Sequence, residues 1–160
     1  MGIARSDNGR AEFSRTTIDI GVVVSDVEKA AEFYGKALGF AEANGFDVPA
    51  QMAGDTGLTD GKPFKVRQFA LGDEATATRL KLMEIPEAGP KPVDNQYICS
   101  SLGLRYLTVF VADLTGTMER LRQHRVAPVR PPYRLAGGAN SLILVKDPDG
   151  NIIELIGPVR

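Results

Sequence analysis

DIGVVVSD, residues 19–26, and YLTVFVAD, residues 106–113, indicate the fold most strongly, because the second stretch repeats the pattern of the first 87 residues later (106 − 19). Each is a short, apolar, β-branched run that ends in aspartate, which is typical of a buried strand followed by a helix N-cap. Amphipathic helical patterns follow at residues 27–38 and 114–126. The sequence therefore predicts two halves with the same order of elements.

The remaining segments complete this repeat. Residues 44–63 contain glycine and proline without sustained periodicity and are predicted to form a loop. Residues 87–102 are predicted to be a linker between a first module at about 17–86 and a second at about 103–158. The polar residues 1–16 are predicted to be a flexible lead-in. Further strands are predicted at residues 65–71, 78–85, 141–146 and 151–156.

The last strand of each half contains a glutamate. Superposing these strands places Glu84, in LKLMEI, over Glu154, in NIIELI, at an offset of 70 residues (154 − 84). Both carboxylates interrupt apolar strands, and burying an unpaired carboxylate costs several kcal/mol. Each glutamate is therefore expected to reach solvent or to have a partner.

The composition excludes several kinds of site. The chain has 160 residues, one histidine, one cysteine and a net charge of −1. This charge balance gives no basic surface for nucleic acid or an anionic membrane, and no apolar run is long enough to span a bilayer. A single cysteine excludes an internal disulfide, and a single histidine excludes zinc or iron sites that need two. Since the first residues contain no apolar leader, the simplest expected location is the cytoplasm.

Four stretches resemble the vicinal oxygen chelate superfamily, which includes glyoxalase I, extradiol dioxygenases and bleomycin resistance proteins. They are VVVSDVEKAAEFYGKALGF, LKLMEI, LTVFVAD and DPDGNIIELIGP, and the resemblance covers about residues 17–158. It implies an α+β fold of two βαβββ modules, whose curved mixed sheets form a barrel-like cleft. It also implies a small-molecule ligand and a homodimer.

The resemblance also implies a set of site residues. Metal-binding members of the superfamily carry their ligands on the first and last strands of each module. These positions fall on Asp19, Glu84, Tyr106 and Glu154. Both glutamates agree with the family pattern, whereas Asp19 and Tyr106 replace the usual histidines. If the four residues converge, their all-oxygen donor set favours Mg²⁺, Mn²⁺ or Ca²⁺ over Zn²⁺ or Ni²⁺.

Two functions are compatible with such a cleft. The first is a glyoxalase-like lyase or isomerase that acts on a small substrate with adjacent oxygens, where Glu84 or Glu154 moves a proton. The second is a metal-free protein of the bleomycin-resistance type that binds or sequesters a small molecule, with Tyr106 as a hydrogen-bond donor. The paired glutamates favour the enzyme, whereas the missing histidines and the aromatic Tyr106 and Phe110 favour the binding protein. An extradiol dioxygenase is disfavoured because its iron is held by two histidines.

Overall fold

The computed structural model describes residues 12–73 and 75–160, so most of the predicted lead-in lies outside the described residues. The first half contains β1 (Asp19–Val23), α1 (Val27–Ala31), η1 (Glu32–Ala37), β2 (Ala41–Val48), α2 (Ala50–Asp55), β3 (Phe64–Ala70), β4 (Arg79–Met83) and η2 (Pro86–Ala88). The second half contains β5 (Tyr106–Phe110), α3 (Leu114–Gln123), β6 (Tyr133–Arg134), β7 (Asn140–Lys146) and β8 (Ile152–Pro158). Both halves begin with the predicted strand and helix.

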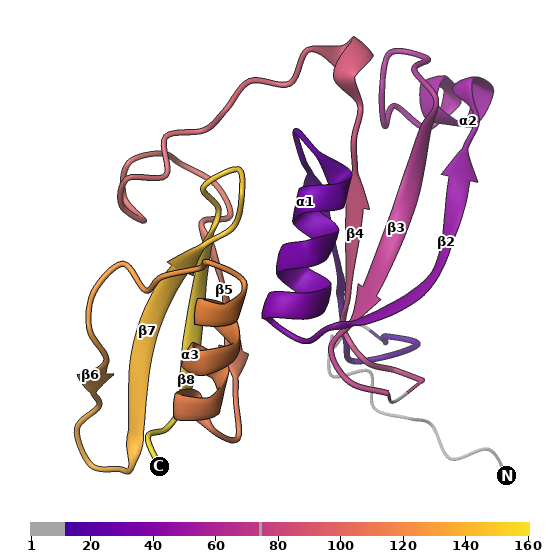
Figure 1. The fold of residues 1–160 in the computed structure, drawn as a ribbon. Coiled ribbons are helices and arrows are strands. Elements are labelled where there is room, and N and C mark those ends of the chain that lie inside the picture. Colours follow the sequence, from indigo (N-terminus) through magenta and orange to yellow (C-terminus); the bar gives the residue numbers. More distant parts are fainter. Residues whose placement is uncertain (1–11, 74) are drawn as a thin grey trace, which may run out of the picture.

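Each half forms one four-stranded mixed sheet (Figure 1), with strand orders β1–β4–β3–β2 and β5–β8–β7–β6. The first strand of each half runs parallel to the last, and the other neighbours are antiparallel. The predicted α+β class with two βαβββ modules is therefore confirmed. The two sheets remain separate and do not close into a barrel, and β1 and β5 lie at sheet edges.

The helices begin where the sequence predicts. Asp26 accepts hydrogen bonds from the backbone N–H groups of the first turn of α1, and Asp113 does the same for α3. These carboxylates satisfy N–H groups that have no partner within the helix. The first helix continues from α1 into the π-helical segment η1 and ends before Gly39, whose φ of 89° suits glycine.

The prediction of a loop at residues 44–63 is wrong, because this stretch contains the end of β2 and all of α2. A β-bulge between Ala43 and Phe46 breaks the alternation of side chains that identifies a strand. Gly45 lies in the bulge, where a Cβ atom would come within 2.2 Å of the carbonyl oxygen of Val66. The glycine that suggested a loop is therefore required by a close backbone contact inside the sheet.

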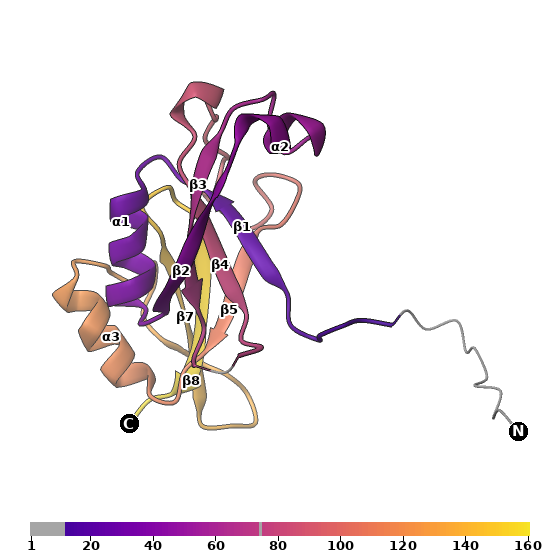
Figure 2. The ribbon, with the colours of Figure 1, turned by 90° about the vertical axis from the view of Figure 1, so that its right-hand side faces the viewer.

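The two modules share one hydrophobic core. The helices α1 and α3 lie side by side in both views (Figures 1 and 2), and α3 contacts η1. The largest fully buried side chains of this core come from both modules and include Tyr34, Phe69, Leu80, Leu82, Leu114, Leu121, Ile143, Ile153 and Leu155. Because apolar side chains of both modules pack in one core, each module needs the other to bury the face of its sheet that carries the helix.

Polar contacts also join the modules. The Tyr34 hydroxyl donates to Oδ2 of Asp147 at 2.8 Å, and both residues are buried. The guanidinium of Arg120, on α3, donates to the carbonyl oxygens of Ala37 and Leu38 at the end of the first helix. These bonds satisfy groups that would otherwise be costly to bury. No helix within the described part of the chain is long and apolar enough to cross a membrane.

Candidate functional site

Each sheet has a core face, which packs on the helices, and an open face on its other side. In the first module, side chains that pack in or against the shared core include Ile20, Val22, Leu80 and Leu82. Because side chains alternate along a strand, their neighbours point the other way. The open face of module 1 therefore carries Asp19, Gly21 and Val23 from β1, and Arg79, Lys81 and Met83 from β4.

The second module has the same construction. Leu107, Val109, Ile153 and Leu155 pack in or against the core. The open face of module 2 therefore carries Tyr106, Thr108 and Phe110 from β5, and Ile152, Glu154 and Ile156 from β8. Three of the four positions implied by the resemblance, Asp19, Tyr106 and Glu154, thus lie on open faces.

The structure does not bring Glu84 to an open face. The parallel register pairs Gly21 with Lys81 in module 1 and Thr108 with Glu154 in module 2. Gly21 and Thr108 are equivalent residues, because they are separated by the same 87 residues as the two first strands (108 − 21). Their partners are therefore equivalent too, so Lys81 is the counterpart of Glu154, at an offset of 73 residues (154 − 81). The sequence superposition was shifted by three residues, an odd number, and such a shift reverses the face of a strand.

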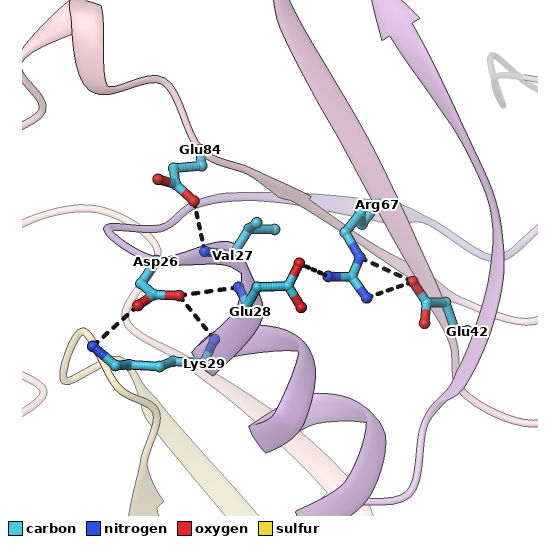
Figure 3. Close-up of polar contacts among 7 residues, drawn as sticks. All are labelled: Asp26, Val27, Glu28, Lys29, Glu42, Arg67 and Glu84. Carbon is cyan, nitrogen blue, oxygen red and sulfur yellow. Dashed lines mark hydrogen bonds and ion pairs between the residues drawn. The ribbon is translucent and has the colours of Figure 1, made fainter.

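Glu84 instead contacts the start of α1 (Figure 3). Its Oε2 accepts a hydrogen bond of 2.9 Å from the backbone N–H of Val27. Asp26 accepts from the N–H groups of Glu28 and Lys29, so the two carboxylates together satisfy three N–H groups of the first turn. A negative charge is also favourable at the positive end of the helix dipole. These contacts describe a helix cap.

Replacing Glu84 by alanine is therefore expected to lower the free energy of unfolding by about 1 kcal/mol, as for loss of a helix cap. Ligand binding at the open faces is expected to stay unchanged. Urea unfolding measures the free energy of unfolding. Glu87→Ala is the matched control, since that exposed carboxylate forms no hydrogen bond or ion pair with described residues. A loss of ligand binding in Glu84→Ala at unchanged stability would contradict the role as a cap.

Next to this cap, Arg67 bridges two acidic side chains. Its guanidinium lies 2.9 Å from Glu28, on α1, and 2.8 Å from Glu42, on β2 (Figure 3). A hollow of about 560 Å³ beside α1 is lined in part by these three residues. It lies on the core side of the sheet, away from Asp19 and Glu154, and its two carboxylates already share one cation.

Asp19 is held by two cations on the open face of module 1. Its Oδ2 lies 3.0 Å from Nζ of Lys81, and its Oδ1 lies 2.8 Å from Nη2 of Arg15. The Asp19 side chain is only 16% exposed. Burial alone would raise the pKa of this carboxyl, but the hydrogen bonds and charges of Lys81 and Arg15 outweigh it and lower the pKa. Asp19 is therefore an ionised carboxylate, each of whose oxygens forms an ion pair with a cation.

The lowered pKa of Asp19 predicts a dependence of stability on pH. As the pH falls, the Asp19 carboxylate takes up a proton in the unfolded chain before it does so in the folded chain. The contribution of Asp19 to the free energy of unfolding is therefore complete above its ordinary pKa of 3.8 and is lost as the pH falls below that value. Asp19→Asn is expected to cost about 1 kcal/mol at neutral pH, and this difference should shrink in acid. Urea unfolding across pH tests it, with Asp55→Asn as the control; a constant difference down to acid pH would contradict it.

Glu154 has a different environment on the open face of module 2. The hydroxyl of Thr108, on the neighbouring strand β5, donates to its Oε1 at 2.8 Å. Its other oxygen, Oε2, has no hydrogen bond within the part of the chain that the structure describes. The phenol of Tyr106 lies on the same face and is 49% exposed. This face therefore offers one available carboxylate oxygen among apolar and aromatic side chains.

Comparison with known proteins agrees with this architecture. The family model of the glyoxalase/bleomycin resistance protein/dioxygenase superfamily matches residues 17–155. The chain belongs to this superfamily. The resemblance noted in the sequence is thereby confirmed for nearly the whole of the two modules. No curated protein matches the chain significantly.

Solved structures of glyoxalase-superfamily proteins share the fold. A glyoxalase family protein from Bacillus cereus has 18% identity and a TM-score of 0.75, with 98% of this chain and 100% of that chain covered. Glyoxalase I from Leishmania major has 22% identity and a TM-score of 0.62, over 90% and 87%. Glyoxalase I from Zea mays has 17% identity and a TM-score of 0.68, over 91% of this chain and 48% of that chain.

The donor set of this glyoxalase-superfamily chain does not fit the expected hard-metal site. The structural counterparts of the four ligand positions are Asp19, Lys81, Tyr106 and Glu154. A lysine ammonium has three hydrogens and no lone pair for a metal, and both oxygens of Asp19 already contact cations. Within the described ranges, no group of three or more His, Cys, Asp or Glu side chains is arranged to hold a metal ion.

Lys81 is the residue that the sequence superposition missed in this superfamily member. Within LKLMEI, Lys81 alternates with the apolar Leu80 and Leu82, so a period of two already places it opposite the core. The same alternation places Glu84 on the side of the two leucines. The period within the strand was therefore a better guide to the open face than the match between two glutamates.

Proposed function

We propose that this protein binds a small-molecule ligand between an open face of module 1 and an open face of module 2, without a resident metal. The observation that carries the proposal is the ion pair between Lys81 and Asp19, because it fills two of the four ligand positions with charges that already neutralise each other. Exposed aromatic side chains support an organic ligand. Phe46 on module 1 and Tyr106 and Phe110 on module 2 are 43%, 49% and 75% exposed.

The proposal includes a homodimer, in which the open face of module 1 in one copy meets the open face of module 2 in the other. Apolar side chains on the open faces, such as Val23 and Phe110, are exposed in the single chain. The charges are complementary, since Arg79 and Lys81 lie on one face and Glu154 lies on the other. A two-fold dimer of this kind forms two equivalent clefts.

The experiment that tests the binding function compares ligand binding before and after removal of metal. A panel of small neutral and charged organic compounds is screened for an increase in Tm, first with the protein as purified and then after treatment with EDTA. The proposal predicts the same binding compounds and the same shifts in both series. Shifts that disappear with EDTA and return with Mg²⁺ or Mn²⁺ would contradict it.

A second candidate function is a lyase or isomerase of the glyoxalase kind, and the available Oε2 of Glu154 favours it. A carboxylate with one free oxygen on an open face can take a proton from a bound substrate. The adduct of glutathione and methylglyoxal is the first substrate to test. If this candidate holds, Glu154→Gln lowers turnover by about 10²- to 10⁴-fold and Glu84→Ala does not. Absence of turnover in the native protein leaves the binding function.

A further inference from the structure

Arg79, on the open face of module 1, is a cation without a partner among the residues that the structure describes. It begins β4 and pairs in register with Asp19 on β1. Its side chain forms no hydrogen bond and no ion pair with the residues that the structure describes, and its Nε is buried. A guanidinium carries five N–H donors, and leaving buried donors unsatisfied is costly. The Nε–H of Arg79 is therefore a buried donor without an acceptor among the described residues.

The surroundings of Arg79 are positively charged. Lys81 follows it on the same face, two residues along β4, and Arg15 lies beside Asp19. Asp19 is shared between Lys81 and Arg15 and does not contact Arg79. The hydroxyl of Thr17 and Oδ1 of Asp19 are further buried polar atoms without a hydrogen bond among the described residues, although Oδ1 lies in the ion pair with Arg15. Two cations thus share the carboxylate of Asp19, and the third cation, Arg79, has no ion pair with the residues that the structure describes.

An apolar wall lies next to these charges. The Lys81 ammonium lies 5.9 Å from the ring centroid of Phe46, on β2. Met83, two residues after Lys81 on β4, packs against the second, smaller hydrophobic cluster, to which the buried Val66 belongs. Apolar neighbours lower the local dielectric constant, which strengthens a contact between a guanidinium and an anion.

We propose that the ligand of this cleft carries an oxyanion, a carboxylate or a phosphate, which Arg79 binds through its fork of N–H groups. Lys81 and Arg15 share the single carboxylate of Asp19, which leaves one further positive charge beside Arg79, and Phe46 contacts the organic part of the ligand. A guanidinium matches the two oxygens of a carboxylate or a phosphate in a bidentate contact. The inference rests on the proposed function, because the oxyanion is part of the ligand that the open faces bind.

The test is titration of the full chain with sodium acetate, sodium oxalate and sodium phosphate, with sodium chloride at matched ionic strength as the reference. Isothermal titration calorimetry and the shift in Tm are measured. We expect saturable binding of at least one oxyanion and none of chloride. Binding of acetate or oxalate alone identifies a carboxylate site, and binding of phosphate alone identifies a phosphate site.

Variants then assign the binding to the open face. Arg79→Gln and Lys81→Gln are expected to weaken oxyanion binding about tenfold or more, since charged hydrogen bonds are lost. Arg79→Lys keeps the charge without the fork and should give an intermediate affinity. Lys65→Gln, on the other face of β3, and Arg130→Gln are the matched controls and should bind as the native protein does.

The outcomes separate this inference from the proposed function. If neutral compounds bind in the presence of EDTA but no oxyanion does, the proposed function stands and the inference is wrong. If Arg79→Gln binds oxyanions as tightly as the native protein but weakens the dimer, Arg79 pairs with the second copy and the inference is wrong. If no compound of any charge binds, both the inference and the proposed function fail.

Discussion

Replacing Tyr34 by phenylalanine is expected to lower the free energy of unfolding by about 2 kcal/mol, the cost of leaving a buried carboxylate short of a donor. Tyr34 is 1% exposed, and its hydroxyl donates to Asp147, which is 5% exposed. The ring itself is retained in the variant, so its packing against Phe33 and Phe40 is unchanged. The loss therefore reports the hydrogen bond that joins the first helix of module 1 to the turn before β8.

The effect of Tyr34→Phe also depends on pH. Burial and the nearby carboxylate of Asp147 raise the pKa of Tyr34 above its ordinary value of 10.0. The protonated Tyr34 phenol therefore contributes its full share to the free energy of unfolding below pH 10.0. Above pH 10.0 this contribution falls, because Tyr34 loses its proton in the unfolded chain but keeps it in the folded chain. The difference between the two proteins should therefore shrink in strong base.

Urea unfolding of the native protein and of Tyr34→Phe measures both effects. Tyr133→Phe is the control, because Tyr133 is 71% exposed and its hydroxyl forms no hydrogen bond with described residues. Equal stability of Tyr34→Phe and the native protein would show that the link between the modules does not depend on this bond.

Replacing Phe110 by aspartate is expected to convert the proposed dimer into a monomer. Phe110 lies on the edge strand β5 and is 75% exposed in the single chain. Truncating a buried aromatic anchor at an interface costs about 2 kcal/mol or more, which weakens association at least roughly 30-fold. The added carboxylate must also be desolvated on entering the interface, which is costly. Because the side chain is exposed, the fold of the monomer should be unaffected.

Sedimentation velocity over a range of protein concentrations measures this change. The native protein should sediment as a dimer at concentrations where Phe110→Asp sediments as a monomer, and the variant should lose ligand binding. Tyr133→Asp, on β6 at the opposite edge of the second sheet, is the control and should remain a dimer. A dimeric Phe110→Asp protein would place the interface elsewhere.

The sequence predicts most of the fold because its signals are local. Asp26 and Asp113 cap the helices as predicted, since an N-cap needs only the backbone of the next turn. The sequence does not reveal β2, because the bulge at Gly45 breaks the alternation of its side chains. Glycine is required there, since the neighbouring strand β3 leaves no room for a Cβ atom. Contacts between strands decide such features, and a single strand does not encode them alone.

The candidate site was predicted only in part, for the same reason. Asp19, Tyr106 and Glu154 lie on open faces, as strand alternation indicates. Glu84 and Lys81 were exchanged because the match of two glutamates fixed a superposition that the hydrogen-bond register of β1 and β4 does not follow. Register depends on pairing across the sheet. The charge of Lys81 at a metal-ligand position could therefore be assigned only from the folded chain.

Elemental analysis of the gently purified protein tests the central claim most directly. We expect no stoichiometric divalent metal in the native protein, and no metal taken up at the open faces when Mg²⁺ or Mn²⁺ is added. The reason is that Lys81 occupies a ligand position and both oxygens of Asp19 already form ion pairs with cations. Glu154→Gln and Glu84→Ala should match the native protein. A stoichiometric metal that is lost in Glu154→Gln and kept in Glu84→Ala would contradict the account.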